Sequence, residues 1–186
     1  MNNSKKNFIV NYIDEFNSAI SKVKSQKKEV EKIYETLIKF QNKKSIHIFG
    51  NGGSASIASH FSMDLTNNSN IKCYSYNDPT LITCFSNDFK YENWISRVLQ
   101  KYGKKNDLLI LISSSGKSKN MLNAVTTSKK MKFSKVVTFT GFDIENPLKK
   151  KGDINIWIDS KNYNVIENSH QFYLLLLVDM IKKYNK

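Results

Sequence analysis

Two short segments rich in glycine and serine each follow an apolar run that is typical of a buried strand. Gly50-Asn51-Gly52-Gly53-Ser54 comes directly after Ile46–Phe49, and Ser113-Ser114-Ser115-Gly116-Lys117-Ser118 comes directly after Leu108–Ile112. Small residues leave backbone N–H groups open to a ligand, and the helix that follows such a turn brings partial positive charge to its first residues. Since parallel strands end at one edge of a sheet, we expect both segments to hold one small phosphorylated ligand there.

An imidazole and a carboxylate follow the first segment at helical spacing. His60 and Asp64 are four residues apart, so they share one face of a helix. Such a pair can bind a metal ion or move a proton at a sugar carbon, and a surface ion pair is the alternative. The surface pair is the stronger interpretation for Glu167 and His170, whereas His47, inside a predicted strand, is interpreted as a packing residue.

Two nucleotide motifs match the segments only in part. Gly50–Ala55 fits G-x-G-x-x-A, but the acidic residue that a dinucleotide site needs after the second strand comes late, at Asp78 before Pro79. Gly116-Lys117-Ser118 resembles the end of a Walker A loop, which would require glycine in place of Leu111. No nucleotide cofactor is therefore expected. Ordinary strand-to-helix turns use the same residue types, but two hydroxyl-rich turns together favour a phosphate monoester.

Alternating elements must position these residues. Apolar spacing of three and four residues predicts a helix over residues 7–42, broken once near Ser25. Strands are predicted at Ser45–Phe49, Lys72–Tyr76, Asp107–Ile112, Lys135–Thr140 and Ile154–Ile158. Further helices are predicted at Ser54–Thr66, with Ser54 as its cap, and at Thr80–Phe85, Tyr91–Tyr102, Lys119–Met131 and Val165–Tyr184. The alternation predicts an α/β fold, a three-layer sandwich with a five-stranded parallel sheet.

Length and composition indicate one globular domain over residues 1–186. The net charge of +13 comes almost entirely from dispersed lysines, and Arg97 is the only arginine, so a nucleic-acid partner is not favoured. We expect neither a membrane span nor a secretion signal, and the unpatterned Cys73 and Cys84 suit a reducing cytoplasm. Residues 1–42 carry more apolar surface than one sheet face needs, which predicts packing on a second subunit.

These segments together resemble the sugar isomerase domain (SIS) family, and within it the bacterial phosphoheptose isomerases. The matching stretches are Gly50–Ser56, His60-Phe61, Asp64-Leu65-Thr66, Asn87-Asp88-Phe89 and residues 113–118. The likeness covers nearly the whole chain. It implies a flavodoxin-like sheet, a homotetramer with active sites shared between subunits, and isomerisation of sedoheptulose 7-phosphate, or a related sugar phosphate, through an enediolate. Heptose supply for surface polysaccharide is the pathway that it implies.

The resemblance also implies roles for individual residues. Ser113, Ser114, Ser115 and Ser118 would hold the phosphate, and Asn51, Gly52, Gly53, Ser54, Asn87, Asp88 and Glu167 would contact the ligand. Asp64 and His60 would be catalytic, and His60, Asp64 and Glu167 would be ligands of a zinc ion.

Five positions depart from the family pattern. Asp64 stands where the family has Glu, Glu167 stands for a glutamine, Leu175 for a histidine, and Asn67-Asn68 for Gly-Arg. Leucine can neither bind metal nor move a proton. Two readings follow: an isomerase with a rearranged site, which the retained serine segment and His60 favour, or a sugar-phosphate-binding relative without turnover, in a regulatory or scaffold role.

Overall fold

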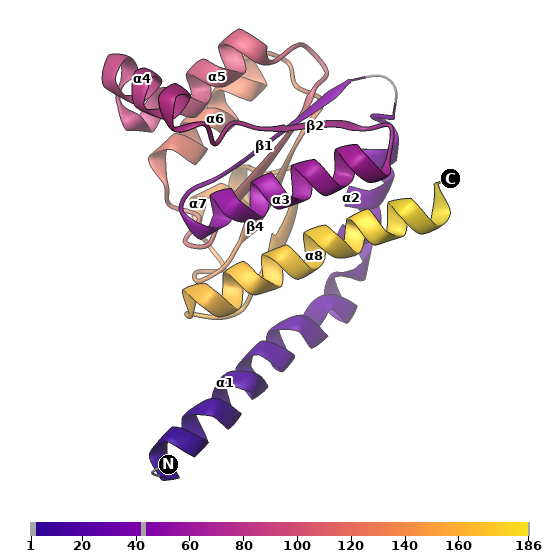
Figure 1. Cartoon of the computed structure of the whole chain (residues 1–186), viewed down its shortest axis with the longest axis vertical. Helices are drawn as coiled ribbons and strands as arrows, with labels where there is room; N and C mark the ends of the chain where they lie inside the picture. Colours follow the sequence, from indigo (N-terminus) through magenta and orange to yellow (C-terminus); the bar gives the residue numbers. More distant parts are fainter. Residues whose placement is uncertain (1–2, 42–43, 186) are drawn as a thin grey trace.

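The computed structural model describes residues 3–41 and 44–185 and shows helices on both faces of one sheet (Figure 1). The strands are β1 (Ser45–Gly50), β2 (Lys72–Ser75), β3 (Leu108–Ser113), β4 (Lys135–Thr140) and β5 (Ile154–Trp157). The helices are α1 (Asn3–Ser21), α2 (Lys27–Ile38), α3 (Gly53–Asn68), α4 (Pro79–Phe89), α5 (Trp94–Tyr102), α6 (Lys119–Lys130), α7 (Pro147–Lys151) and α8 (Tyr163–Tyr184). Two 3₁₀ helices complete the set, η1 (Lys22–Gln26) and η2 (Tyr91–Asn93).

The sheet is parallel throughout, in the order β2-β1-β3-β4-β5. This is the flavodoxin-like order, in which the chain reverses direction across the sheet between β1 and β3. The register pairs Gly50 with Ile112, so β1 and β3 end at the same level. The predicted fold class is therefore confirmed, and the two glycine- and serine-rich segments leave the sheet side by side.

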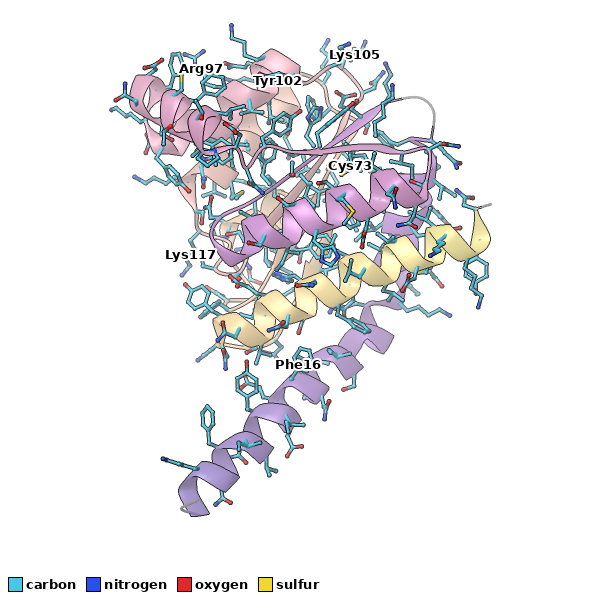
Figure 2. All side chains as sticks on the ribbon, viewed as in Figure 1. Phe16, Cys73, Arg97, Tyr102, Lys105 and Lys117 are labelled. Atoms are coloured by element: carbon cyan, nitrogen blue, oxygen red, sulfur yellow. The ribbon has the colours of Figure 1, made fainter. Side chains whose placement is uncertain are left out.

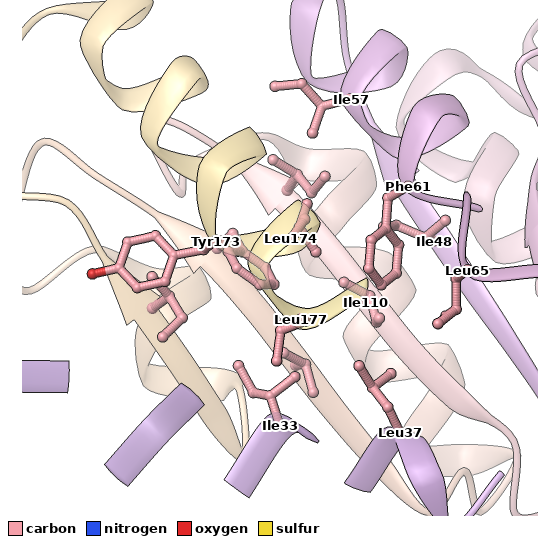
Figure 3. Close-up of a cluster of buried hydrophobic side chains, with 14 of the residues drawn as sticks. Ile33, Leu37, Ile48, Ile57, Phe61, Leu65, Ile110, Tyr173, Leu174 and Leu177 are labelled. Atoms are coloured by element: carbon pink, nitrogen blue, oxygen red, sulfur yellow. The ribbon is translucent and has the colours of Figure 1, made fainter. Parts of the chain in front are cut away.

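Two apolar layers hold the helices on the sheet. One layer joins α2, α3 and α8 to the sheet, and the other joins α5 and α6 to its opposite face. Figure 3 shows the first layer, in which side chains of the three helices converge on two central strands: Ile33, Leu37, Phe61, Leu65, Leu174 and Leu177 over Ile48 and Ile110. Each such side chain, once fully buried, stabilises the fold by about 1.5–3 kcal/mol, which explains the continuous apolar strand runs.

Three local predictions need correction. The break in the first helix is confirmed, as η1, but residues 86–88 are not a connection because α4 continues to Phe89. Helix α7 was not predicted, although Asn146 caps it by accepting from the N–H of Lys149 and Pro147 begins it. Ser54 does not cap α3, because the helix already begins at Gly53 and Gly52 is its cap residue.

Helix α1 extends beyond the rest of the molecule (Figure 1). Its second half is attached to the domain, where Phe16 packs on the core and Ser160 Oγ donates to Glu15 Oε1 at 2.6 Å. Its first half exposes large apolar side chains, with Phe8 67% and Val10 55% exposed. The sheet of one chain does not cover this apolar surface. Within residues 3–41 and 44–185, no helix has the length and apolar character to cross a membrane.

Two histidines are buried in the core. His170 is fully buried, and its Nε2 donates to the carbonyl of Thr140 at 3.1 Å. His47 lies between Asp107 Oδ2, 3.0 Å from Nε2, and the hydroxyl of Tyr76, 2.9 Å from Nδ1. This confirms His47 as a packing residue and removes His170 from the surface, where an ion pair with Glu167 was the favoured interpretation.

The folded state should lose stability in mild acid because of these histidines. Burial lowers the pKa of His170 to about 4 and also lowers that of His47, against the opposing influence of Asp107. In the unfolded chain both titrate near 6.5, so below that pH the unfolded state binds more protons. Stability is therefore full above pH 6.5 and falls as the pH drops towards 4. His170 alone accounts for a loss of about 2 kcal/mol between pH 7.5 and pH 5.

Denaturant unfolding of the wild-type protein and of His170→Gln at both pH values tests this. The variant should lose about 2 kcal/mol less than the wild type on acidification. His60→Gln, which removes an imidazole outside the core, is the control for the loss of a histidine as such. An equal loss in His170→Gln would assign the acid sensitivity to other groups.

Candidate active site

The two glycine- and serine-rich segments enclose one polar cavity of about 140 Å³. The first segment contributes Asn51 and Ser54, and α8 contributes Tyr163 and Glu167. The second segment contributes four serines: Ser113, Ser114, Ser115 and Ser118. The structure thus brings these residues together over the end of the sheet, although they lie far apart in the sequence. All of them except Tyr163 were predicted to contact the ligand. Tyr163 was not predicted, because an aromatic residue at a helix start carries no signal of its own.

The glycines of the first segment allow the close turn from β1 into α3. A Cβ at Gly50 would collide with the carbonyl of Ser54, and Gly52 has φ 54°, a left-handed conformation. The N–H groups of Ser54 and Ala55 donate back to the carbonyls of Asn51 and Gly52. The turn therefore uses two of its own amides, and fewer remain open than the sequence suggested.

The second segment keeps hydroxyl groups available instead. Ser118 occupies the cap position of α6, but its side chain caps nothing and lies 3.4 Å from Ser113 Oγ. Ser114 is 5% exposed, and its hydroxyl has no hydrogen-bond partner. A buried hydroxyl without a partner costs stability, so a ligand or a water molecule that reached this serine would remove that cost.

A bracing contact fixes the shape of the second segment. Gly116 has φ 63°, and a Cβ there would overlap the side chain of Asn146, the cap residue of α7. The N–H of Leu148 donates to the carbonyl of Gly116 at 3.1 Å. Helix α7, which was not predicted from the sequence, thus holds the serine turn in place through Asn146 and Leu148. We use the name serine cradle for residues 113–118 held in this way.

Glu167 reaches across from α8 to the start of α3. Its carboxylate occupies the space that a Cβ on Gly53 would need. Burial raises the pKa of this carboxyl above its ordinary value. Glu167 thus lines the cavity from α8, next to the first segment.

Asn51 is held in one orientation by two residues that the sequence reasoning did not single out. Its side-chain amide forms a reciprocal pair with Asn120, at 2.9 and 3.2 Å, and its Oδ1 also accepts from the hydroxyl of Tyr91 at 3.0 Å. Asn120 is 2% exposed. The pair leaves Asn51 one N–H to offer to a ligand. Because these partners lie 69 and 40 residues from Asn51, no local spacing could have revealed them.

A second hollow, of about 400 Å³, adjoins the cavity and shares Asn51 and Ser118 with it. Lys90 and Tyr91 line its other side. Lys90 has φ 68° and ψ 147°, a conformation that is costly for any residue but glycine and that is retained mainly at functional sites. The two hollows give a ligand room to extend beyond the serine cradle.

Asn87 and Asp88 are placed differently from the prediction. Both are exposed on α4, where Asn87 Nδ2 donates to Asp88 Oδ1 at 3.1 Å. Neither lines the cavity or the adjoining hollow. Their contact with a sugar therefore stays a prediction.

His60 and Asp64 form the pair that their spacing predicted, with Nε2 and Oδ2 3.2 Å apart and both side chains open to solvent. Gln171 on α8 lies 3.4 Å from His60 Nδ1. Donation by the Gln171 amide to Nδ1 leaves the proton of a neutral His60 on Nε2, where it is donated to Asp64. The pair lies outside the cavity: His60 and Asp64 follow Gly53 by about 10 and 16 Å along the axis of α3.

The positions of His60, Asp64 and Glu167 decide whether these three side chains can bind one zinc ion. Glu167 lies at the start of α3, whereas the His60–Asp64 pair lies two to three turns further on, next to Gln171. In the part of the chain that the structure describes, no three His, Cys, Asp or Glu side chains are grouped to hold a metal. The three expected ligands therefore do not fit a zinc centre within one chain, and zinc stays a prediction.

The SIS domain family model matches residues 11–141. The chain belongs to the SIS domain family. It is 35% identical over 182 residues to the phosphoheptose isomerase of Buchnera aphidicola subsp. Acyrthosiphon pisum (strain APS), covering 91% of this chain and 93% of the relative. It is 34% identical over 164 residues to that of Helicobacter pylori (strain ATCC 700392 / 26695), covering 85% and 83%.

Solved structures support the same fold. The structure superposes on a phosphoheptose isomerase from Francisella tularensis with a TM-score of 0.88 at 24% identity, over 98% of this chain and 100% of that one. A phosphoheptose isomerase from Neisseria gonorrhoeae gives a TM-score of 0.85 at 23% identity, over 96% and 98%. The SIS fold predicted from the sequence is thereby confirmed.

Loosening Asn51 should weaken ligand binding. In Asn120→Asp the new carboxylate cannot donate to Asn51, although it still accepts from the backbone in the first turn of α6, where Asp is tolerated. We expect a sugar phosphate to bind about tenfold more weakly by calorimetry, which corresponds to about 1.4 kcal/mol, the size of one lost hydrogen bond.

Two further variants separate orientation from charge. Tyr91→Phe removes only the hydroxyl that donates to Asn51 and should also weaken binding. Asn168→Asp adds the same charge at an exposed position of α8 and should bind the ligand as the wild type does. Unchanged affinity in both Asn120→Asp and Tyr91→Phe would show that the orientation of Asn51 does not matter.

Proposed function

We propose that the protein is a sugar-phosphate isomerase of the phosphoheptose isomerase type, which interconverts the ketose and aldose forms of sedoheptulose 7-phosphate or a related sugar phosphate. One observation carries the proposal: the serine cradle meets the first segment in one polar cavity, which is lined by Ser114, whose buried hydroxyl has no partner. The match to curated phosphoheptose isomerases along nearly their whole length supports the same activity.

The serine cradle would hold the phosphate. The hydroxyls of Ser114, Ser115 and Ser118 supply donors for the three oxygens of a monoester, and the N-terminus of α6 adds partial positive charge. Lys117 is exposed on the same turn and strengthens the attraction. The remaining N–H of Asn51 would bind an oxygen of the sugar chain.

Asp64 and His60 would move the proton. In a ketose-to-aldose interconversion, a base removes a proton from C1 to form an enediolate and returns it at C2, while the proton of the O1 hydroxyl moves to O2, so atoms balance without a co-reactant. The Asp64 carboxylate is the base in this proposal, and the Nε2–H of His60 fixes one of its oxygens so that the other is free to accept the carbon-bound proton. No step requires a metal ion.

The non-catalytic reading remains the second candidate because of Leu175, which lies on α8 one turn beyond Gln171, the residue that contacts His60. A leucine there removes one proton-carrying group that the resemblance implies. The full-length relatives favour the isomerase, and turnover decides between the two.

We propose further that the active protein is a cytoplasmic homotetramer with shared sites. Its support is the uncovered apolar half of α1, where Phe8, Ile9, Val10 and Ile13 are each about half exposed or more. The position of His60 and Asp64 outside the cavity of their own chain gives the assembly a role, since a neighbouring subunit can bring this pair to the cavity. Cys73 and Cys84 are both free thiols, as a reducing compartment allows.

Turnover of sedoheptulose 7-phosphate, followed by NMR with and without zinc, tests the function. We expect the wild-type protein to form the aldose, Asp64→Asn to lose turnover while still binding the sugar phosphate, and Ser118→Ala to bind it about fivefold or more weakly, the size of a lost hydrogen bond of about 1 kcal/mol. Tight binding without turnover in the wild type would make the non-catalytic reading correct. Full activity in Asp64→Asn would assign the base to another residue.

Mixed assemblies test whether sites are shared. If the cavity of one subunit works with the His60–Asp64 pair of another, then subunits carrying Ser118→Ala and subunits carrying Asp64→Asn should recover part of the wild-type activity when they are refolded together. Light scattering should give the mass of a tetramer, and Phe8→Glu with Ile13→Glu should reduce it. No recovery in a mixed assembly of correct mass would mean that each site uses one chain.

A further inference from the structure

A polar groove of about 390 Å³ lies between α5 and α6, on the face of the sheet opposite α3 and α8. Its volume is within the range of small-molecule sites. Hydrogen-bonding side chains form most of its lining: Ser96, Arg97, Gln100, Asn123, Thr126 and Thr127. None of the residues that form the serine cradle takes part.

Arg97 is the only arginine of the chain, and it lines this groove. Its guanidinium stacks over the ring of Phe89, 4.0 Å from the centroid, and Nη1 donates to Gln100 Oε1 at 3.0 Å. Among the described residues no carboxylate pairs with it. A stacked guanidinium is held in a fixed orientation and still has donors for an anion.

Ser96 provides a second, independent observation. It is 7% exposed, it lines the groove, and its hydroxyl has no hydrogen-bond partner. A buried serine on a helix usually donates to a carbonyl one turn earlier, and an unpaired hydroxyl there is unfavourable until a ligand or a water molecule satisfies it.

The charges around the groove favour an anion. None of its lining residues is acidic, and Glu92, the neighbour of Asn93, is paired with Lys119 at 3.8 Å. Lys101 and Lys130 follow Arg97 and Thr126 by four residues and so lie one helical turn further on. A guanidinium fork beside several hydroxyl groups matches the oxygens of a phosphate.

We propose that this groove is a second phosphate-binding site, separate from the serine cradle. Figure 2 shows Arg97 at the α4–α5 side of the molecule and Lys117, on the serine cradle, well away from it. Phe89 and Asn93 line the groove, and Lys90 and Tyr91, between them, line the hollow beside Asn51. A phosphate in the groove would therefore contact the segment whose Tyr91 orients Asn51.

Calorimetric titration with inorganic phosphate tests the proposal in a protein that carries Ser115→Ala and Ser118→Ala, so that the serine cradle contributes little. This parent should still bind phosphate saturably. Adding Arg97→Gln should weaken binding at least tenfold. Adding Lys183→Gln removes the same charge but should leave phosphate binding unchanged. Lys183 lies over the ring of Tyr184, on the other face of the sheet.

Two variants keep the test decisive if Arg97→Gln does not fold. Arg97→Lys keeps the charge over Phe89 but loses the fork, and it should bind several times more weakly. Ser96→Ala should weaken binding about threefold while its melting temperature stays the same or rises, because its hydroxyl has no partner to lose. Absence of saturable binding in the parent, or equal binding in the Arg97 and Ser96 variants, would overturn the proposal.

Discussion

The pairing of β1 with β3 is the constraint on which the site depends. Because Gly50 lies opposite Ile112, both strands end at one level and both turns open over the same edge. A shift of the register by two residues would keep the apolar faces buried but would displace the turns by about 6–7 Å, more than the width of a phosphate group. The apolar layers on both faces hold this register, so the position of the two turns depends on the packing of the core.

Much of the fold follows from local patterns. Strands buried on both faces read as nearly continuous apolar runs, as β3 does, and all five strands were predicted within a residue or two. The wrong predictions concern two helices, α4 and α7, whose residues also favour turns. Helix α4 continues through Ser86–Asp88, polar residues that read as a turn. Asn146-Pro147 carries a helix-start signal, but the helix has only five residues, too few to show an apolar period.

Local patterns predicted only the site residues that lie on the turns themselves, and the family resemblance added Glu167. The serine cradle and Asn51 follow from glycine and serine placed after strands. Asn120, Tyr91 and Tyr163 could not be found in that way, since each acts through a contact between distant parts of the chain. The same limit applies to the His60–Asp64 pair: spacing predicted the pair correctly but could not show that it lies outside the cavity.

The brace between Gly116 and helix α7 has a consequence for the energetics of recognition. Since Asn146 fills the space beneath Gly116 and Leu148 donates to its carbonyl, the serine cradle has its shape without a ligand. A preformed loop gives up little conformational entropy on association, so more of the gross attraction becomes affinity. The same rigidity limits which substitutions the loop tolerates. Even alanine at position 116 would collide with Asn146, so the serines can be replaced but the backbone of the loop cannot take another course.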